Sequence, residues 1–361
     1  MRRRAAASAS FILPDFLLQV LITPAIVALQ LIALSVTSTA LLASGFAWKI
    51  LRHWNMSSGS ELQIRLERQT YLISTLLGFT LGAELLSLLL FVHTAEGLST
   101  QFAGAMCATG VLNINSFGFP ALLLKITVFF LAALWLLLDR VDNQGYDYPL
   151  IRVKYGLLLA ITPLTVVESI VQTRFFLGLE PEVITSCCGS LFNADYQGIA
   201  PELAGLPVQP ALAVFYAMAV LILISGGWLL CTFTLNHASR GQEEIAAMLF
   251  AAVCLISFVA AIIAIVTFLS PYVYENPHHH CPFCLLKAGY DYAGYALYLP
   301  LFLATAAGMG AGMIAWYRRI ASLQPVIPGE VRRLTWLALG GFGLFYGLAT
   351  WLIGRSNLIL F

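Results

Sequence analysis

Charged residues are scarce in this chain. Its 361 residues include 19 lysines and arginines and 18 aspartates and glutamates, so only 10% of the chain is charged, whereas 60% is hydrophobic. A soluble domain is about 25% charged and about 45–50% apolar. The composition therefore excludes a soluble enzyme, a disordered protein and a nucleic-acid-binding protein. The net charge of +1 gives no electrostatic bias toward a polymeric partner.

Motifs for nucleotides and for some common metal centres are also absent. The chain has no G-x-x-x-x-G-K-[ST] phosphate loop and no H-E-x-x-H zinc motif. Covalent haem attachment by C-x-x-C-H is excluded because Leu285 follows Cys284. We therefore expect neither a nucleotide nor a nucleic acid as a partner.

The chain has long apolar runs instead. Eight segments approach or exceed the length of about 20 apolar residues that a membrane helix needs, which predicts an all-α, polytopic integral membrane bundle in a lipid bilayer. The first segment is too long for one straight crossing, so we expect a tilted helix or a short interfacial helix that ends near Pro24. Without a visible repeat or linker, we expect one transmembrane domain over residues 1–361. The expected helices cover residues 16–48, 70–93, 120–138, 155–177, 211–235, 245–270, 285–316 and 335–353.

Basic residues are distributed unevenly among the loops. The loops after the first, third, fifth and seventh expected helices carry lysine and arginine, whereas the other three are nearly bare, with Lys287 alone beside a histidine run. Because basic loops stay in the cytoplasm, the bare loops are expected on the periplasmic face of a bacterial inner membrane. These periplasmic loops are residues 94–119, 178–210 and 271–290.

Cysteine is confined to one set of loops. Two of the seven cysteines, Cys231 and Cys254, lie within expected helices and are interpreted as small core residues. Thiols on an oxidising membrane face become disulfides, redox centres or metal ligands. The remaining cysteines all lie in the expected periplasmic loops: Cys107, Cys187, Cys188, Cys281 and Cys284.

The segment Cys281-Pro282-Phe283-Cys284 suggests redox chemistry. At a helix start the helix dipole would lower the pKa of the Cys281 thiol and make it the attacking thiolate. The segment resembles glutaredoxin-type active sites in these four residues, which concerns chemistry and not fold. The first hypothesis is a membrane thiol–disulfide oxidoreductase or electron relay. In it this pair exchanges with Cys187 or Cys188 and passes electrons to a quinone, a periplasmic thiol protein or an electron-transfer protein.

A metal site is the second hypothesis. His278, His279 and His280 directly precede Cys281, and three histidines with two cysteines can bind a thiophilic ion such as Cu⁺, Zn²⁺ or Hg²⁺. The other loop cysteines, Cys107, Cys187 and Cys188, would complete the ligand shell. Both hypotheses predict that the five loop sulfurs lie close together. A third hypothesis is a structural subunit of a membrane complex, with its loops stapled by disulfides.

Three ionisable residues lie within the expected helices. Glu84, Lys125 and Glu168 are costly inside a membrane, so each is a candidate site residue. They form either an ion pair that keeps the helices in register or a pocket that handles protons or lipid headgroups. Tyr295 and Tyr298 begin the seventh helix and either belong to an interfacial belt or hold a quinone ring. Together these five residues are the candidate cofactor-binding residues.

Overall fold

The chain folds into helices. The structure, a computed structural model, describes residues 20–54, 60–180, 205–234 and 239–359, and no strand occurs in these ranges. Eight of the helices described there are long and apolar enough to cross a membrane, which confirms the all-helical fold class and the expected number of long helices. They are α2 (Pro24–His53), α3 (Glu61–Leu98), α5 (Gly118–Asp142), α6 (Ile151–Leu177), α9 (Val208–Thr234), α10 (Arg240–Ala264), α12 (Ala293–Ala315) and α13 (Ile327–Arg355).

Most of these helices extend beyond the apolar runs that predicted them, because their ends are polar and capped. α3 begins at Glu61, where the Ser60 hydroxyl accepts a hydrogen bond from the Gln63 N–H at 3.3 Å. A capping box of Ser239 and Gln242 begins α10. The expected break near Pro24 is present: Val20 and Leu21 are helical, residues 22–23 are not, and α2 starts at the proline.

The seventh long helix starts later than predicted. The expected helix began at residue 285, but α12 begins at Ala293. Asp291 and Tyr292 have φ values of 54° and 53°, in the left-handed region that a right-handed helix cannot contain. The residues before them form only two short 3₁₀ turns, η3 (Cys284–Leu286) and η4 (Ala288–Tyr290).

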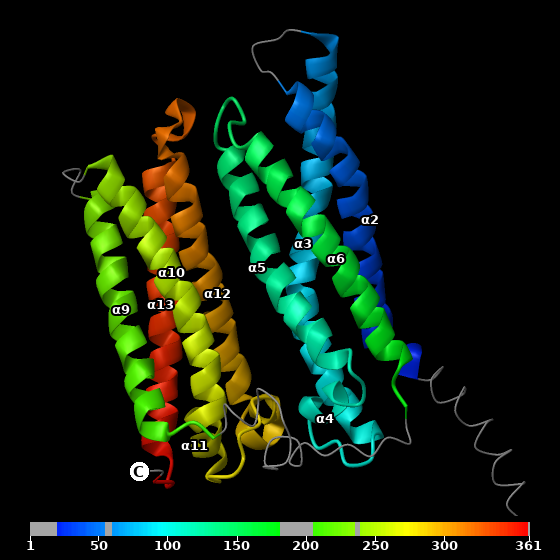
Figure 1. Cartoon of the computed structure of the whole chain (residues 1–361), viewed down its shortest axis with the longest axis vertical. Coiled ribbons are helices and arrows are strands. Elements are labelled where there is room, and N and C mark those ends of the chain that lie inside the picture. Colours follow the sequence, from blue (N-terminus) through cyan, green and yellow to red (C-terminus); the bar gives the residue numbers. More distant parts are fainter. Residues whose placement is uncertain (1–19, 55–59, 181–204, 235–238, 360–361) are drawn as a thin grey trace, which may run out of the picture. The chain divides into compact units, whose positions relative to one another are not determined.

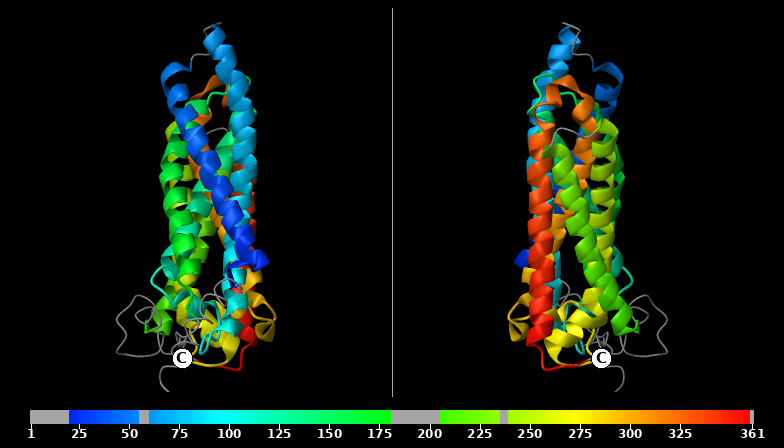
Figure 2. Two further views of the ribbon diagram at one scale, coloured as in Figure 1. Left: turned by 90° about the vertical axis from the view of Figure 1, so that its right-hand side faces the viewer. Right: turned by 90° about the vertical axis from the view of Figure 1, so that its left-hand side faces the viewer.

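The helices group into two compact units. Unit 1 comprises Met1–Asp142 and Asp147–Ser186, and unit 2 comprises Asn143–Tyr146 and Cys187–Phe361. In unit 1, α2 packs against α3, α3 against α5, α5 against α6, and α6 against α2. In unit 2, α9, α10, α12 and α13 form the same closed ring of neighbours (Figures 1 and 2). Each unit is thus a four-helix bundle with consecutive helices as neighbours. The single transmembrane domain stays a prediction.

The two bundles share one further feature. In each bundle, the connection between the second and third long helices carries cysteine. Cys107 lies between α3 and α5, and Cys281 and Cys284 lie between α10 and α12. The sequence shows no repeat, so this correspondence is a finding of the structure.

Close helix contact in unit 2 depends on glycine. A Cβ atom on Gly312 of α12 would lie 2.5 Å from the Ala251 Cβ atom and 2.8 Å from the Ala247 carbonyl oxygen, both on α10. Gly308, one turn earlier, abuts Cys254 of α10 in the same way. Two small residues four apart therefore allow α10 and α12 to pack closely, as in other membrane helix pairs.

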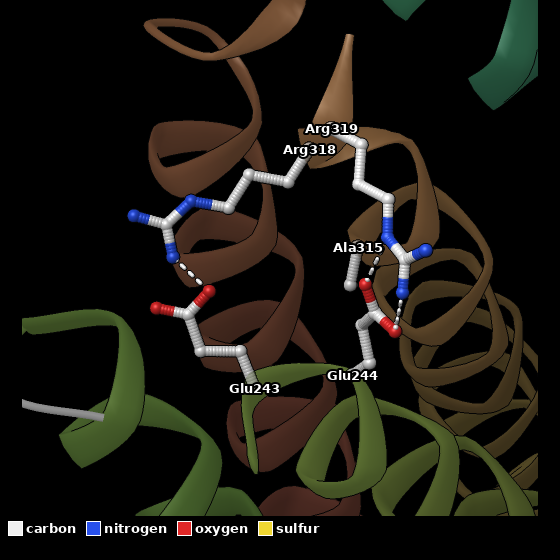
Figure 3. Close-up of a pocket in the computed structure, with 5 residues that line it drawn as sticks. All are labelled: Glu243, Glu244, Ala315, Arg318 and Arg319. Carbon is white, nitrogen blue, oxygen red and sulfur yellow. Dashed lines mark hydrogen bonds and ion pairs between the residues drawn. The ribbon is translucent and has the colours of Figure 1, made fainter. Parts of the chain in front are cut away.

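Ion pairs also join these two helices, at the start of α10 and just after the end of α12. Arg318 pairs with Glu243, and the Arg319 guanidinium donates two hydrogen bonds to Glu244, at 2.8 and 2.6 Å (Figure 3). The Arg318 guanidinium also lies 5.2 Å from the centre of the Phe233 ring of α9. This end of unit 2 is therefore held by charge rather than by close packing.

We predict that Gly312→Val destabilises unit 2, because the added side chain overlaps α10 backbone and side-chain atoms. Overpacking of this kind costs about 1–3 kcal/mol. Thermal unfolding of the purified protein in detergent measures the loss. The matched control is Gly340→Val, since a Cβ atom on Gly340 has nothing within 4 Å. Equal melting temperatures for the two variants would contradict the close α10–α12 contact.

Candidate functional site

A pair of buried thiols lies between α11 (Ser270–Tyr274) and α12. The Cys281 and Cys284 Sγ atoms are within 4.8 Å of each other. Cys281 is 1% exposed and Cys284 is 5% exposed. The two sulfurs of the C-x-x-C segment therefore converge on one point, shielded from water.

The position of this pair corrects one expectation. Cys281 does not lie at the start of a long helix: it precedes a single 3₁₀ turn of three residues, and α12 begins only at Ala293. The helix dipole comes from many aligned peptide units, which so short a turn lacks. The predicted activation of the Cys281 thiol by a helix dipole is therefore wrong.

Two tyrosine hydroxyls fix the backbone of the thiol pair. The Tyr274 hydroxyl donates to the Cys281 carbonyl at 2.6 Å, and the Tyr298 hydroxyl donates to the Pro282 carbonyl at 2.9 Å. Tyr298 thus lies beside the cysteines, whereas the Tyr295 ring contacts that of Tyr292, with 6.3 Å between ring centres. The loop is held in one conformation before any ligand arrives.

Aromatic rings surround Tyr274. The rings of His279 and Tyr290 lie with their centres 4.3 and 4.4 Å from that of Tyr274. Burial, together with the nearby Cys284, raises the pKa of Tyr290, so its hydroxyl stays protonated at neutral pH. His278 is exposed, and its backbone N–H donates to the Asn276 side chain at 3.0 Å.

His280 is oriented by an irregularity in the preceding helix. α10 continues into a π-helical segment, Ile265–Leu269, in which the Ser270 N–H donates to the Ile265 carbonyl. The next donor in this register would be Pro271, which has no N–H, so the Val266 carbonyl needs another partner. His280 Nδ1 lies 2.9 Å from it. The carbonyl can only accept, so Nδ1 carries the hydrogen of this bond.

Cys107 of unit 1 is fully buried and lies immediately before the short helix α4 (Ala108–Leu112). The Ala108 N–H donates to the Glu96 carboxylate at 2.8 Å. The Asn115 side-chain amide donates to the Phe175 and Gly178 carbonyls, each at 3.0 Å, and so ties this connection to the end of α6. The connection that carries Cys107 is therefore anchored both to α3 and to the end of α6.

The other cysteines divide into two groups. Cys254 is buried in α10, as expected for a core residue, whereas Cys231 is exposed on α9. Cys187 and Cys188 lie outside the described residues. Because of this, and because Cys107 and the C-x-x-C pair belong to different units, the clustering of all five loop sulfurs stays a prediction.

The three ionisable residues of unit 1 meet in one buried triad. Lys125 Nζ lies 3.2 Å from Glu84 Oε1 and 2.7 Å from Glu168 Oε1, and all three side chains are at most 1% exposed. The ammonium also donates to the Ser87 hydroxyl at 3.0 Å, and this hydroxyl donates to Glu84 Oε1 at 2.9 Å. The predicted ion pair is confirmed, with both acids contacting the lysine. It joins α3, α5 and α6.

Comparison of the chain with known protein families, curated proteins and solved structures finds no match. The site is therefore interpreted from its own geometry.

We predict that Lys125→Met lowers the free energy of unfolding by about 3–5 kcal/mol, because it removes the cation that both carboxyl groups contact. Unfolding in detergent, followed by circular dichroism, measures the change. The control is the triple variant with Glu84→Gln and Glu168→Gln added, which leaves no buried charge and should recover most of the loss. Similar stability of the single and triple variants would show that the triad is not the cause.

Proposed function

We propose that this chain is an integral membrane protein whose outward thiols bind a thiophilic metal ion such as Cu⁺, Zn²⁺ or Hg²⁺. The eight long apolar helices support the membrane setting. Their large apolar side chains remain exposed along whole helices, for example Leu42 and Phe79, each 77% exposed, which suits contact with lipid. The scarcity of charge in the sequence supports the same setting.

The thiol pair carries the metal proposal. Cys281 and Cys284 have sulfurs within 4.8 Å that are not bonded to each other. Thiolates on one tetrahedral ion stand roughly 4 Å apart, as Zn–S bonds of about 2.3 Å require. Thiolate ligands select soft ions over magnesium or calcium. Burial of the two sulfurs hinders thiol–disulfide exchange with another protein. It is compatible with a metal ion held between the sulfurs.

His280 supports the same proposal. Its Nδ1–H faces the Val266 carbonyl at 2.9 Å, which is the arrangement that fixes the ring orientation of metal-binding histidines and directs Nε2 to the ion. His280 also directly precedes Cys281. Its ring nitrogens do not lie within 4.8 Å of both sulfurs, so we propose it as a ligand that a bound ion would draw toward the thiolates, while Tyr274 and Tyr298 hold the loop.

Further thiolates come from the same membrane side. Four long helices lie between the Cys107 connection and the Cys281 connection. In a membrane an even number of crossings returns the chain to the side it left. Two of these helices, α5 and α6, separate Cys107 from Cys187 and Cys188, so these cysteines emerge on that side as well. We propose that Cys187 or Cys188 completes the ligand set at the periplasmic face.

A second candidate function is thiol oxidation. Sulfurs within 4.8 Å need only a small movement to form a disulfide bond of about 2.05 Å. Oxidation would join Cys281 to Cys284, release two protons and two electrons, and convert a quinone beside Tyr298 and Tyr295 to its quinol. The lack of a helix dipole and the burial of both thiols make this the second choice.

We predict that the full-length protein, purified in detergent under reducing, oxygen-free conditions, binds one Cd²⁺ per chain. Cadmium is the probe because its bonds to thiolate absorb in the ultraviolet. Cys281→Ser with Cys284→Ser should abolish this absorption, whereas the control Cys231→Ser should retain it. Unchanged cadmium absorption in the double variant would disprove the metal proposal.

The same preparation separates the two candidate functions. Mass spectrometry of protein taken directly from cells reports whether Cys281 and Cys284 are joined. A disulfide that is reduced by dithiothreitol and restored by added quinone, with no bound metal in the native protein, would favour the thiol oxidoreductase instead.

We predict opposite sidedness for two exposed positions, His278 before the thiol pair and Arg332 on α13. A membrane-impermeant maleimide should label His278→Cys in intact spheroplasts and Arg332→Cys only after lysis. The native thiols of the pair are buried and label slowly, and both variants also carry Cys187→Ser and Cys188→Ser, which removes the other thiols expected on that face. The reverse pattern would invert the orientation and contradict the periplasmic location.

A further inference from the structure

We propose that the Glu84–Lys125–Glu168 triad of unit 1 is a proton-binding site that holds one exchangeable proton between its two carboxyl groups. The site is separate from the thiols and its properties do not depend on the metal proposal. The ligand is the proton itself, taken up by a carboxylate to give a carboxylic acid.

The balance of charge is the first argument. Two ionised carboxylates and one ammonium would leave one uncompensated negative charge among residues that are at most 1% exposed. Buried charge without a partner is strongly unfavourable, and two carboxylates that share a site do not both stay ionised. One added proton makes the triad neutral. The proton belongs to the pair of acids rather than to one of them.

An unsatisfied oxygen is the second argument. Glu84 Oε1 contacts both the Lys125 ammonium and the Ser87 hydroxyl. Its other oxygen, Oε2, is buried and has no hydrogen-bond partner among the described residues. A bound proton relieves the charge on this oxygen without any further ligand. A metal cation would instead need several oxygen ligands and would be repelled by the ammonium.

Among the described residues, no other charged group pairs with the triad. α2 packs against α3 and α6 and has no charged residue between Pro24 and Trp48. The nearest charged or titratable groups toward the cysteine end, His93 on α3 and Arg174 on α6, are exposed and more than one turn away. A Phe91 ring lies 5.9 Å from Lys125 Nζ.

Polar side chains continue from Glu168 along α6 and onto the neighbouring helix α2. Gln172 lies one turn further along the same face of α6, and its side-chain oxygen is buried without a hydrogen-bond partner in the described part of the chain. Its amide donates to the Leu29 carbonyl at 3.3 Å. Beside it, the Thr173 hydroxyl donates at 3.1 Å to the side chain of Gln30, which is half-buried. These polar groups on α6 and α2 lie between the triad and the cysteine end of unit 1.

Infrared spectroscopy of the full-length protein tests the proposal. The carbonyl stretch of a protonated carboxyl group is measured at neutral pH in H₂O and D₂O. Wild-type protein should show a carboxylic acid that Glu84→Gln loses and that Glu168→Gln also loses. Each substitution leaves a single carboxylate opposite the ammonium, a neutral pair that needs no proton. Glu67→Gln, at an exposed carboxylate of α3, is the control that should retain the signal.

Two outcomes overturn the proposal: no carboxylic acid signal in wild-type protein, or an unchanged signal in either triad variant. If a single variant does not fold, the charge-free triple variant with Lys125→Met replaces it, and retention of the signal there also overturns the proposal. Cadmium binding should be unchanged in these variants, so failure of the proton site and failure of the metal site are distinguishable.

Discussion

Polar groups in this protein must find their partners between helices, because the outward surfaces of the long helices are largely apolar. The backbone N–H and C=O groups of a helix form hydrogen bonds with each other, but a buried charged side chain needs a partner on another helix. In unit 1, Lys125 joins α3, α5 and α6 through two glutamates. At the other end of the bundle, Lys154 of α6 pairs with Asp139 and Asp142 of α5 at 2.9 and 2.8 Å. α5 and α6 take part in both sets of ion pairs. A shift of one of these helices along the other would separate both sets, so the ion pairs fix the register between α5 and α6.

Unit 2 meets the same constraint differently. Its helix pair α10 and α12 is joined by glycine contacts, and by ion pairs where α10 begins and α12 ends. A further group of polar contacts lies in the connection before α12. There Pro271 denies the Val266 carbonyl a backbone donor, and His280 supplies one. The irregular end of α10 thus orients a side chain beside the thiols, as π-helical segments often do at functional sites.

The sequence predicted those features that depend on composition alone. Long apolar runs gave the helices, and the depth of Lys125 in its run required an acidic partner, which the structure confirms. Helix ends were missed because caps such as Ser60 are polar and lie outside the apolar runs. The start of α12 was missed because a left-handed Asp291 is only weakly signalled by its residue type, and a left-handed Tyr292 is not signalled at all. The sequence did not predict that the same four-helix arrangement occurs in both units. Helices with different residues can pack in the same way, so the arrangement leaves no sequence repeat.

The Lys154 triad shows why the Lys125 triad is more than a structural contact. Both place two carboxyl groups on one ammonium, but the excess charge near Lys154 has other means of stabilisation. The Asp139 side chain is 18% exposed and therefore reaches solvent, and Asp142 accepts the Leu150 N–H at 2.7 Å. Near Lys125 neither acid is exposed, and Glu84 Oε2 has no hydrogen-bond donor among the described residues. A single glutamate would satisfy Lys125 and join two helices. The second acid adds a negative charge, and this excess charge is the reason that we propose a bound proton at the Lys125 triad and not at the Lys154 triad.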